Sequence, residues 1–251
     1  RGTTPPTLLF TTWAPTVSLG RSQSYALDVD EQACKKYGVK IIRRHSGGQA
    51  VYLDEGYFVF SAIAHPDALT SNLTRLRHEF CSMMIDTLHT YDVPAHFSEP
   101  DNVIVQQPHI QTLGNSGQII HANAVVAQGS LRHHLEDLDV MLDVLKVNGQ
   151  KLNDHAPEIY KILTDIRRHN DHVTQEEIRH TFLHYFLERT HGHIREGQLS
   201  YDETERIKHF LQEEKNLEWV KGQETDKTRG VCYFFVNGYK HNLVPSLPLS
   251  Y

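Results

Sequence analysis

The chain has 251 residues, 39% hydrophobic and 22% charged, which is enough for one large domain with a substantial core. Its formal net charge of −6 weighs against a sequence-independent nucleic-acid binder, because such a protein needs a basic surface. The sequence has no apolar run long enough to cross a membrane and no signal-peptide apolar region. These features predict a cytoplasmic protein that contacts neither nucleic acid nor membrane.

The potential metal-binding and redox residues lack a recognisable pattern. The 18 histidines are scattered, and no HExxH sequence occurs. The three cysteines, Cys34, Cys81 and Cys232, are far apart and never form a CxxC pair. This spacing predicts free thiols in a reducing compartment.

The first half of the chain is predicted to form strands around one long helix. Leu69–Tyr91 carries apolar residues at three- and four-residue steps, which predicts a helix that packs on the core. Short β-prone runs bounded by glycine, proline or polar clusters predict the strands. These runs are Thr7–Thr12, Thr16–Leu19, Val39–Arg43, Ala50–Leu53, Tyr57–Ala64, Asn102–Gln106 and Ile119–Gln128.

The second half is predicted to be helical. Leu135–Leu145 places leucines on one helical face, and capping boxes at Thr174 and Ser200 open two further helices. A polar linker at Thr225–Arg229 is followed by an aromatic strand at Val231–Val236. Strands followed by helices predict the α+β class with a mixed or antiparallel sheet.

The stretch RRHSGGQAVYLD places two arginines directly before two glycines. Gly47 and Gly48 permit a tight turn or a close backbone approach to a ligand. Arg43 and Arg44 are suited to phosphate or carboxylate recognition, but also to a solvated surface. Local chemistry alone leaves both an anion-binding loop and a plain strand–turn–strand open.

Several motifs in fixed order resemble one family. From about Pro5 to about Gly222 the chain contains PPTLLFTTWAPTVSLGRSQ, RRHSGGQAV with a following Asp54, LGNSGQ, QGSL, QLSYDETERIKHFLQEE and LEWVKG. In this order they resemble the lipoate–protein ligase and octanoyltransferase family. The resemblance implies an α+β fold with a central mixed sheet and packed helices, as in biotin and lipoate ligases. It also implies a catalytic domain over residues 1–222, with residues 223–251 as a linker and tail strand.

The resemblance implies transfer of a lipoyl or octanoyl group to a lysine of a lipoyl domain or other carrier protein. One route uses ATP and magnesium with lipoate or octanoate and passes through an acyl-adenylate. The other route takes the acyl group from a carrier protein. The resemblance also allows an accessory subunit that completes the active site.

The resemblance assigns a set of residues to the acyl or adenylate site. In the family the RRxxGG loop closes on the acyl chain or the acyl-adenylate, with the arginine placed for phosphate and the glycines open to a close ligand. The matching positions here, together with those in LGNSGQ and QGSL, are Arg44, Ser46, Gly47, Gly48, Gly114, Asn115, Gly129 and Ser130.

Two catalytic positions depart from the family pattern. Gln111 stands where the family has a lysine that stabilises the charge developing during transfer, and glutamine carries no charge. His96 stands where one transferase branch has its nucleophilic cysteine. The resemblance leads us to expect His96 and Gln111 in one cleft, which the Arg43–Val51 loop also lines.

Smaller departures surround these two. Leu53 stands in place of a histidine before Asp54, Gln49 replaces a third glycine, and Gln128 replaces the histidine of HGS. The family's Asn–Asp pair is reversed, so Asp101 is a candidate for holding magnesium or the adenine end, or is an ordinary turn residue.

Three functions therefore remain open from the sequence. The first is an active acyl ligase or transferase, and the second is a degenerate member that binds acyl ligands or lipoyl domains without turnover. A biotin-type ligase is disfavoured, because no GRGRxGRxW-like loop occurs. The family's first strand and its ALDEA-like helix have no match here, which predicts an uncovered sheet edge that the strand after Gly230 is a candidate to cover.

Overall fold

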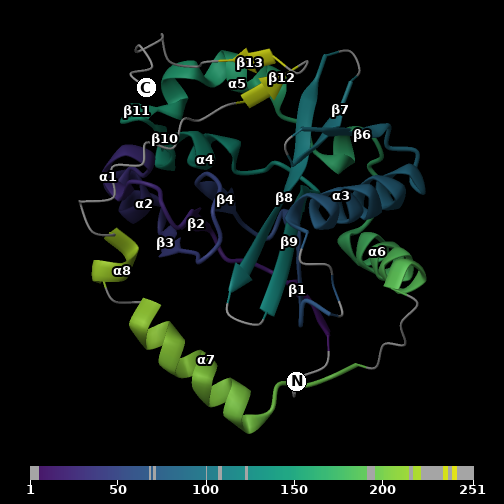
Figure 1. Ribbon diagram of the computed structural model, residues 1–251. Coiled ribbons are helices and arrows are strands. Elements are labelled where there is room, and N and C mark those ends of the chain that lie inside the picture. Colours follow the sequence, from purple (N-terminus) through teal and green to yellow (C-terminus); the bar gives the residue numbers. More distant parts are fainter. Residues whose placement is uncertain are drawn as a thin grey trace.

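The computed structural model describes residues 6–67, 69, 72–99, 101–106, 109–121, 124–190, 196–214, 217–221, 234–236 and 239–241. Strands and short helices alternate up to the first long helix, after which a pair of hairpins completes the sheet (Figure 1). These elements are β1 (Thr7–Thr11), β2 (Thr16–Leu19), α1 (Tyr25–Asp28), α2 (Glu31–Tyr37), β3 (Lys40–Arg43), β4 (Val51–Leu53), β5 (Tyr57–Ala64), α3 (Leu73–His89), β6 (Ala95–Ser98), β7 (Asn102–Val105), β8 (Gln111–His121) and β9 (Ala124–Arg132).

Helices dominate the remainder of the described chain. They are interrupted by two short hairpins, and no helix in this part is both long and apolar enough to span a bilayer. The elements are α4 (Leu138–Val144), β10 (Lys146–Val147), β11 (Gln150–Lys151), η1 (Leu152–His155), α5 (Ala156–Ile162), η2 (Ile166–Arg168), α6 (Gln175–Thr190), α7 (Tyr201–Glu214), α8 (Leu217–Lys221), β12 (Phe234–Val236) and β13 (Tyr239–His241).

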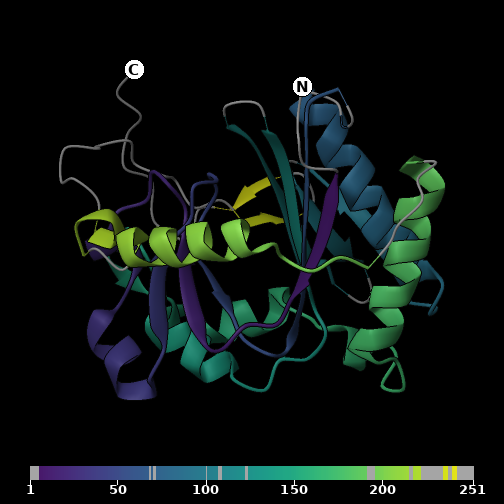
Figure 2. The same cartoon turned by 90° about the horizontal axis from the view of Figure 1, so that it is seen from below.

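The large sheet has the strand order β1-β5-β9-β8-β7-β6, and every neighbouring pair is antiparallel. Helices α3 and α6 lie together on one side of it (Figure 2). Leu76, Phe80 and Met84 recur at four-residue steps along α3 and are all buried against the sheet. Together with Phe60 of β5 and Phe182 of α6 they form the larger hydrophobic core.

The small sheet lies on the other side, with the order β3-β2-β4. Strands β2 and β3 are parallel and β2 and β4 are antiparallel, so the mixed pairing of this fold resides here. Val17 and Leu19 of β2 pack with Cys34 of α2, Leu142 of α4 and Ile159 of α5 in a second buried core. The predicted α+β class is confirmed.

Most predicted elements occur with their limits shifted by a few residues, and the capping boxes form as expected. Thr174 Oγ1 accepts the Glu177 amide N–H at 3.2 Å, while the Glu177 carboxylate accepts the Thr174 N–H at 2.8 Å. The single strand predicted over Ile119–Gln128 is wrong. His121 pairs with Ala124, so this apolar run is the two arms of the β8–β9 hairpin.

Two expectations concern the C-terminal region. Within the described residues the tail strand β12 pairs with β13 in a separate two-stranded sheet, and the covering of the uncovered edge by residues after Gly230 remains a prediction. The linker at Thr225–Arg229 lies outside the described residues. The division into a domain of residues 1–222 and a tail remains a prediction.

Candidate functional site

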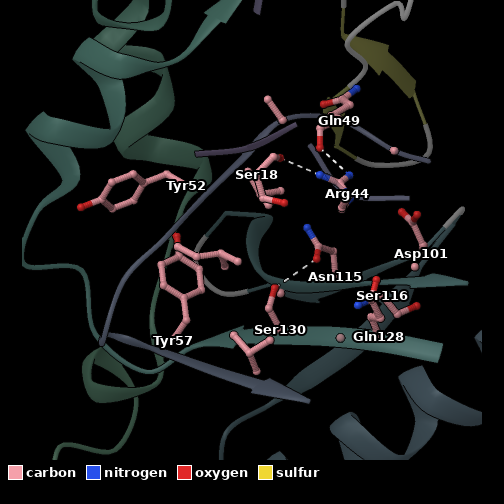
Figure 3. Close-up of a pocket in the computed structure, with 18 of the residues that line it drawn as sticks. Ser18, Arg44, Gln49, Tyr52, Tyr57, Asp101, Asn115, Ser116, Gln128 and Ser130 are labelled. Carbon is pink, nitrogen blue, oxygen red and sulfur yellow. Dashed lines mark hydrogen bonds between the residues drawn. The ribbon is translucent and has the colours of Figure 1, made fainter. Parts of the chain in front are cut away.

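A cavity of about 620 Å³ lies between the two sheets (Figure 3). Its floor is the face of β5, β8 and β9 turned away from α3, and its roof is β2, β4 and the loop that joins β3 to β4. Side chains of α4, η1 and α5 close one end with apolar groups. The mixture of apolar walls and a few polar groups is typical of a small-molecule site.

Successive side chains of β9 point to opposite faces of the sheet, and this alternation determines which of them reach the cavity floor. Gln128, Ser130 and Arg132 line the cavity, while Leu131 packs in the large core. A Cβ on Gly129 would lie 2.4 Å from the Phe60 ring, so the packing of the core requires glycine at this position, which also lines the cavity. The sequence alone did not distinguish these two uses of a glycine.

The loop after β3 lines the cavity at residue 44 and throughout residues 46–51, as the sequence predicted. Gly48 has a positive φ of 89°. A Cβ on Gly20 would lie 1.9 Å from the Gly48 carbonyl oxygen, so the loop passes against Gly20 without room for a side chain. A Cβ on Gly47 would meet nothing within 4 Å, so Gly47 presents open backbone beside the cavity.

Arg44 holds this loop in place. Its Nη1 donates to the Ser18 carbonyl at 2.6 Å, and its Nη2 donates to the carbonyls of Gly47 at 2.8 Å and Gln49 at 2.7 Å (Figure 3). The terminal nitrogens are therefore engaged with backbone in this conformation, and a phosphate would have to compete with three carbonyls. The expected phosphate contact of Arg44 remains a prediction.

The other arginine of the pair is a structural residue. Arg43 is 3% exposed, and its guanidinium donates to the carbonyls of Gly20 and Gln23 at 2.9 and 2.7 Å. Its Nε donates to the Trp219 and Val220 carbonyls, and the Trp219 indole N–H donates back to the Arg43 carbonyl. The closing LEWVKG motif is thus joined directly to the base of the glycine loop.

Polar contacts tie the roof to the floor. Ser46 Oγ donates to Gln128 Oε1 at 3.1 Å, and the Gln128 amide donates to Ser61 Oγ at 3.3 Å. Asn115 and Ser130 face each other across β8 and β9, and the Ser130 hydroxyl donates to the Asn115 amide oxygen at 3.1 Å (Figure 3). A Cβ on Gly114 would lie 2.2 Å from the Ser130 carbonyl, which explains the glycine beside Asn115.

Charged groups line the cavity at several places. Asp101 is the acid on its wall within the described chain, and burial raises the pKa of its carboxyl, which Arg77 partly offsets. Lys146 of β10 and Arg132 of β9 also line it, and sequence analysis missed both. Lys146 follows a predicted helix, and Arg132 ends a strand whose alternation from Gln128 and Ser130 would have identified it.

The two catalytic candidates lie outside the cavity, so the expectation that they share a cleft with the glycine loop is wrong. His96 is exposed on the edge strand β6, with its ring 6.4 Å from that of His89. Gln111 begins β8, and its amide donates to the carbonyls of Lys161 at 3.1 Å and Leu163 at 3.2 Å. An amide has two N–H donors, so Gln111 can bind both carbonyls and hold the end of α5 against the sheet.

The two cysteines in the described part of the chain, Cys34 and Cys81, do not line the cavity either. Cys34 lies in the small core and Cys81 in the large core, and neither lines the cavity. Burial raises the pKa of each thiol to about 11, so both are protonated at neutral pH. Cys232 lies outside the described residues.

Comparison with known proteins gives sequence relatives of two named activities. The chain is 26% identical over 222 residues to a lipoate-protein ligase of Bacillus subtilis, covering 86% of this chain and 64% of that protein. It is 22% identical over 229 residues to an octanoyltransferase of Anoxybacillus flavithermus, covering 80% and 81%. The chain therefore spans less than two thirds of the Bacillus subtilis relative.

Solved structures share the fold. A structure from a study of a bi-partite lipoate protein ligase and its E2 lipoyl domain from Thermoplasma acidophilum superposes with a TM-score of 0.78 at 23% identity, covering 88% of this chain and 86% of that one. A second Thermoplasma acidophilum structure, with bound lipoic acid, gives 0.75 at 21% identity and covers 87% and 86%. A lipoate-protein ligase A bound with ATP gives 0.73 at 23% identity and covers 86% of each chain.

The decisive match is to a family model. The lipoyl protein ligase A/B catalytic domain matches residues 1–187, which include the glycine loop, β8, β9 and the whole described floor of the cavity. This match agrees with the order of motifs in the sequence and with the shared fold. The chain therefore belongs to the lipoyl protein ligase A/B catalytic domain family.

Proposed function

We propose that this protein attaches a lipoyl or octanoyl group to a lysine of a lipoyl domain. The proposal rests on one observation: motifs that are distant in the sequence line the same cavity. Arg44, Gly47 and Gly48 lie in its roof, and Asn115 and Ser130 lie in its floor. The volume of about 620 Å³ is in the range of small-molecule sites. Relatives named as lipoate-protein ligase and octanoyltransferase support this substrate class.

The geometry favours an acyl-adenylate route over a thioester route. In the first step the acyl carboxylate attacks the α-phosphate of ATP, forms acyl-adenylate and releases pyrophosphate. In the second step the acceptor lysine amine attacks the acyl carbonyl and releases AMP. A thioester route needs a reactive thiolate at the cavity, whereas the two cysteines in the described part of the chain, Cys34 and Cys81, are buried elsewhere with raised pKa values.

Magnesium fits this route at one position. Mg²⁺ is commonly held by one or two carboxylates together with the phosphates of its substrate. Asp101 provides a carboxylate on the cavity wall, and no cluster of three metal-ligating side chains occurs among the described residues. Asp101 would therefore share the ion with the nucleotide, and the ion would offset the phosphate charge during adenylation.

The acceptor and an accessory chain are the proposed protein partners. A Thermoplasma acidophilum relative is named as subunit 1 of a lipoate-protein ligase A. It is 25% identical to this chain over 230 residues, which cover 86% of this chain. A lipoyl domain and a second subunit are accordingly proposed for this protein.

A second candidate function is a binding module without turnover. It is favoured by Gln111, which replaces the family's lysine and is engaged with two carbonyls of the α5 end. Loss of a catalytic charge stabiliser typically lowers the rate by on the order of 10²–10³-fold. Such a module would retain the cavity but lack rapid acyl transfer.

One assay separates the two functions. The protein is incubated with labelled ATP and octanoate, and octanoyl-AMP is measured before and after addition of a lipoyl domain. Formation of octanoyl-AMP followed by an octanoylated lysine supports the enzyme. Binding of octanoate and ATP without either product supports the binding module, and absence of binding contradicts both.

A further inference from the structure

The floor of the cavity contains a buried cation that forms no ion pair within the described part of the chain. Arg132 is the last residue of β9, is 7% exposed and lines the cavity beside Ser130. Within the described residues its guanidinium takes part in no hydrogen bond or ion pair at normal distances. A guanidinium stays protonated and has five N–H donors. Those of Arg132 are not among the fully buried atoms without a partner, so they open on the cavity.

The neighbouring groups do not supply the missing charge. Asp165 is the acid that interacts electrostatically with Arg132, but its carboxylate pairs with Arg168 Nε at 3.1 Å and accepts the Arg168 N–H. Tyr57 lies directly opposite Arg132 in the β5–β9 register, is also buried and lines the same cavity. Its hydroxyl makes no hydrogen bond in the described part of the chain, so it is a second donor on the same floor.

The other basic residues on the cavity wall differ from Arg132. Arg44 donates to three backbone carbonyls, and Arg77 donates to Gln118 Oε1 at 3.4 Å. Lys146 is only partly buried on the two-residue strand β10. Arg132 therefore combines burial, an open guanidinium and a position on a long, well-paired strand.

Arg132 lies where the pairing between β8 and β9 ends. The β8–β9 pairing ends where Leu131 faces Gly114, so Arg132 lies directly beyond the last residue of β9 that pairs with β8, and Gly114 lines the same cavity. A planar guanidinium can bind a carboxylate or a phosphate through two parallel hydrogen bonds.

We propose that Arg132, together with the Tyr57 hydroxyl, forms an oxyanion-binding site on the cavity floor. The proposal rests on the proposed function for the identity of the ligands. Its occupant is the carboxylate of the acyl substrate or the phosphate of the nucleotide, both of which offer oxygen atoms to the same donors. In the low-dielectric cavity such a charge-assisted contact is stronger than in water.

Calorimetric titration of the native protein with octanoate, AMP and octanamide tests this site. Octanamide has the same chain as octanoate but no charge. In Arg132→Met we expect affinity for octanoate or AMP to fall roughly 10- to 100-fold, as for loss of a charged hydrogen bond, while octanamide binds as to the native protein. The probe that loses affinity identifies the occupant, and Arg132→Lys should recover part of the loss.

Two controls separate binding from folding. Arg179→Met removes an exposed arginine of α6 and should leave all three affinities unchanged. Tyr57→Phe removes only the hydroxyl and should weaken the same oxyanion by about 2- to 10-fold, which keeps the test available if Arg132→Met does not fold. Equal oxyanion affinity in the native protein and in the folded variants overturns the site.

The outcomes distinguish the site from the proposed function. Arg132-dependent octanoate or AMP binding without acyl transfer supports the site and contradicts the enzyme. Acyl transfer by the native protein with oxyanion affinity independent of Arg132 and Tyr57 supports the enzyme and overturns the site. Failure of the native protein to bind either oxyanion also overturns the site.

Discussion

The two cores on either side of the cavity are built differently. The large core consists of long antiparallel strands and two long helices, α3 and α6, with aromatic side chains at its centre. The small core joins a three-stranded sheet to helices of four to seven residues. Short helices are marginal alone, so tertiary packing must hold those around the small core.

This difference assigns the two cores different parts in the site. The long strands β5, β8 and β9 fix the floor residues by backbone pairing on both sides. The roof and the apolar end depend on single side chains that join short elements, such as Arg43 to α8 and Gln111 to α5. Floor variants should therefore change stability or specific contacts, whereas roof and end variants should change the shape of the cavity.

The largest effect is expected from Phe80→Ala in the large core. Phe80 is 1% exposed and stacks on Phe60 with ring centroids 5.6 Å apart. Its truncation should lower the free energy of unfolding by about 3–5 kcal/mol, measured by chemical denaturation. Ile207→Ala on α7, where 41% of the residue is exposed, is the control with little change. A Phe80→Ala protein as stable as the native one would contradict the burial of α3.

Leu142→Ala makes the corresponding change in the small core. Leu142 is fully buried on α4, next to Met141 and close to Leu145, which both line the apolar end of the cavity. We expect a loss of about 2–5 kcal/mol and also weaker octanoate binding, because α4 can shift into the space left behind. For folded Phe80→Ala protein, octanoate affinity should stay near the native value. If Leu142→Ala and Phe80→Ala changed the octanoate affinity equally, the proposed difference between the two cores would be contradicted.

Two glycines provide a sharper comparison between floor and roof. Gly129→Ala drives a methyl group into the Phe60 ring and should cost about 1–3 kcal/mol of stability. Gly47→Ala meets open space, so its stability should remain native while ligand affinity falls because the new methyl group borders the cavity. Thermal unfolding and octanoate titration measure the two effects. Unchanged affinity in Gly47→Ala would exclude a close ligand approach at this glycine.

The sequence predicted the large core better than the small one for a physical reason. The α3 helix spans several turns, so its apolar period is evident in the sequence, and β5 is a continuous apolar run between glycine and proline. Helices such as α1 and α5 are too short to show a period, and their limits depend on packing. The β8–β9 turn was missed because apolar residues continue on both sides of it.

The parts of the site that could be predicted are those where the backbone needs a conformation or a close approach that glycine allows. Gly47 and Gly48 form the loop expected from the glycine pair, and Asn115 and Ser130 meet across a strand pair. The charges were not predictable in this way. Arg43 and Arg44 are adjacent in sequence, yet one joins α8 and the other holds the loop, a division that only three-dimensional contacts determine.

Gln111→Lys tests whether charge at the end of β8 limits activity. Gln111 lies outside the cavity but directly before Thr112, which lines it. If the longer lysine side chain reaches past Thr112, it should raise octanoyl-AMP formation by up to about 10-fold, because it brings a cation toward the developing negative charge. The gain should be limited because the substitution also removes the hydrogen bonds from the Gln111 amide to the two carbonyls at the end of α5. Gln111→Met keeps the length without charge and should give no gain. A comparable gain in Gln111→Met would show that loosening α5, and not charge, controls the rate.

The smallest effect concerns His133, which continues β9 beyond Arg132. His133 Nε2 donates to the Val173 carbonyl at 2.7 Å, which leaves Nδ1 to accept from His134 Nδ1 at 3.1 Å. Protonation of His133 would place two donors against each other. Burial, with smaller contributions from His134 and Arg167, lowers the pKa of His133, while the Val173 carbonyl and Asp165 partly offset this.

The sign of the pH dependence follows from this lowered pKa. Above about pH 6.5, the ordinary histidine value, His133 is neutral in both folded and unfolded chains. As the pH falls below that value the unfolded chain binds the proton first, so stability should decrease until the lowered pKa of the folded state is passed. We expect less than about 1 kcal/mol between pH 7 and 5, with a reduced slope in His133→Gln and an unchanged slope in the exposed His172→Gln. Equal slopes in the native protein and His133→Gln would show that groups other than His133 govern the acid sensitivity.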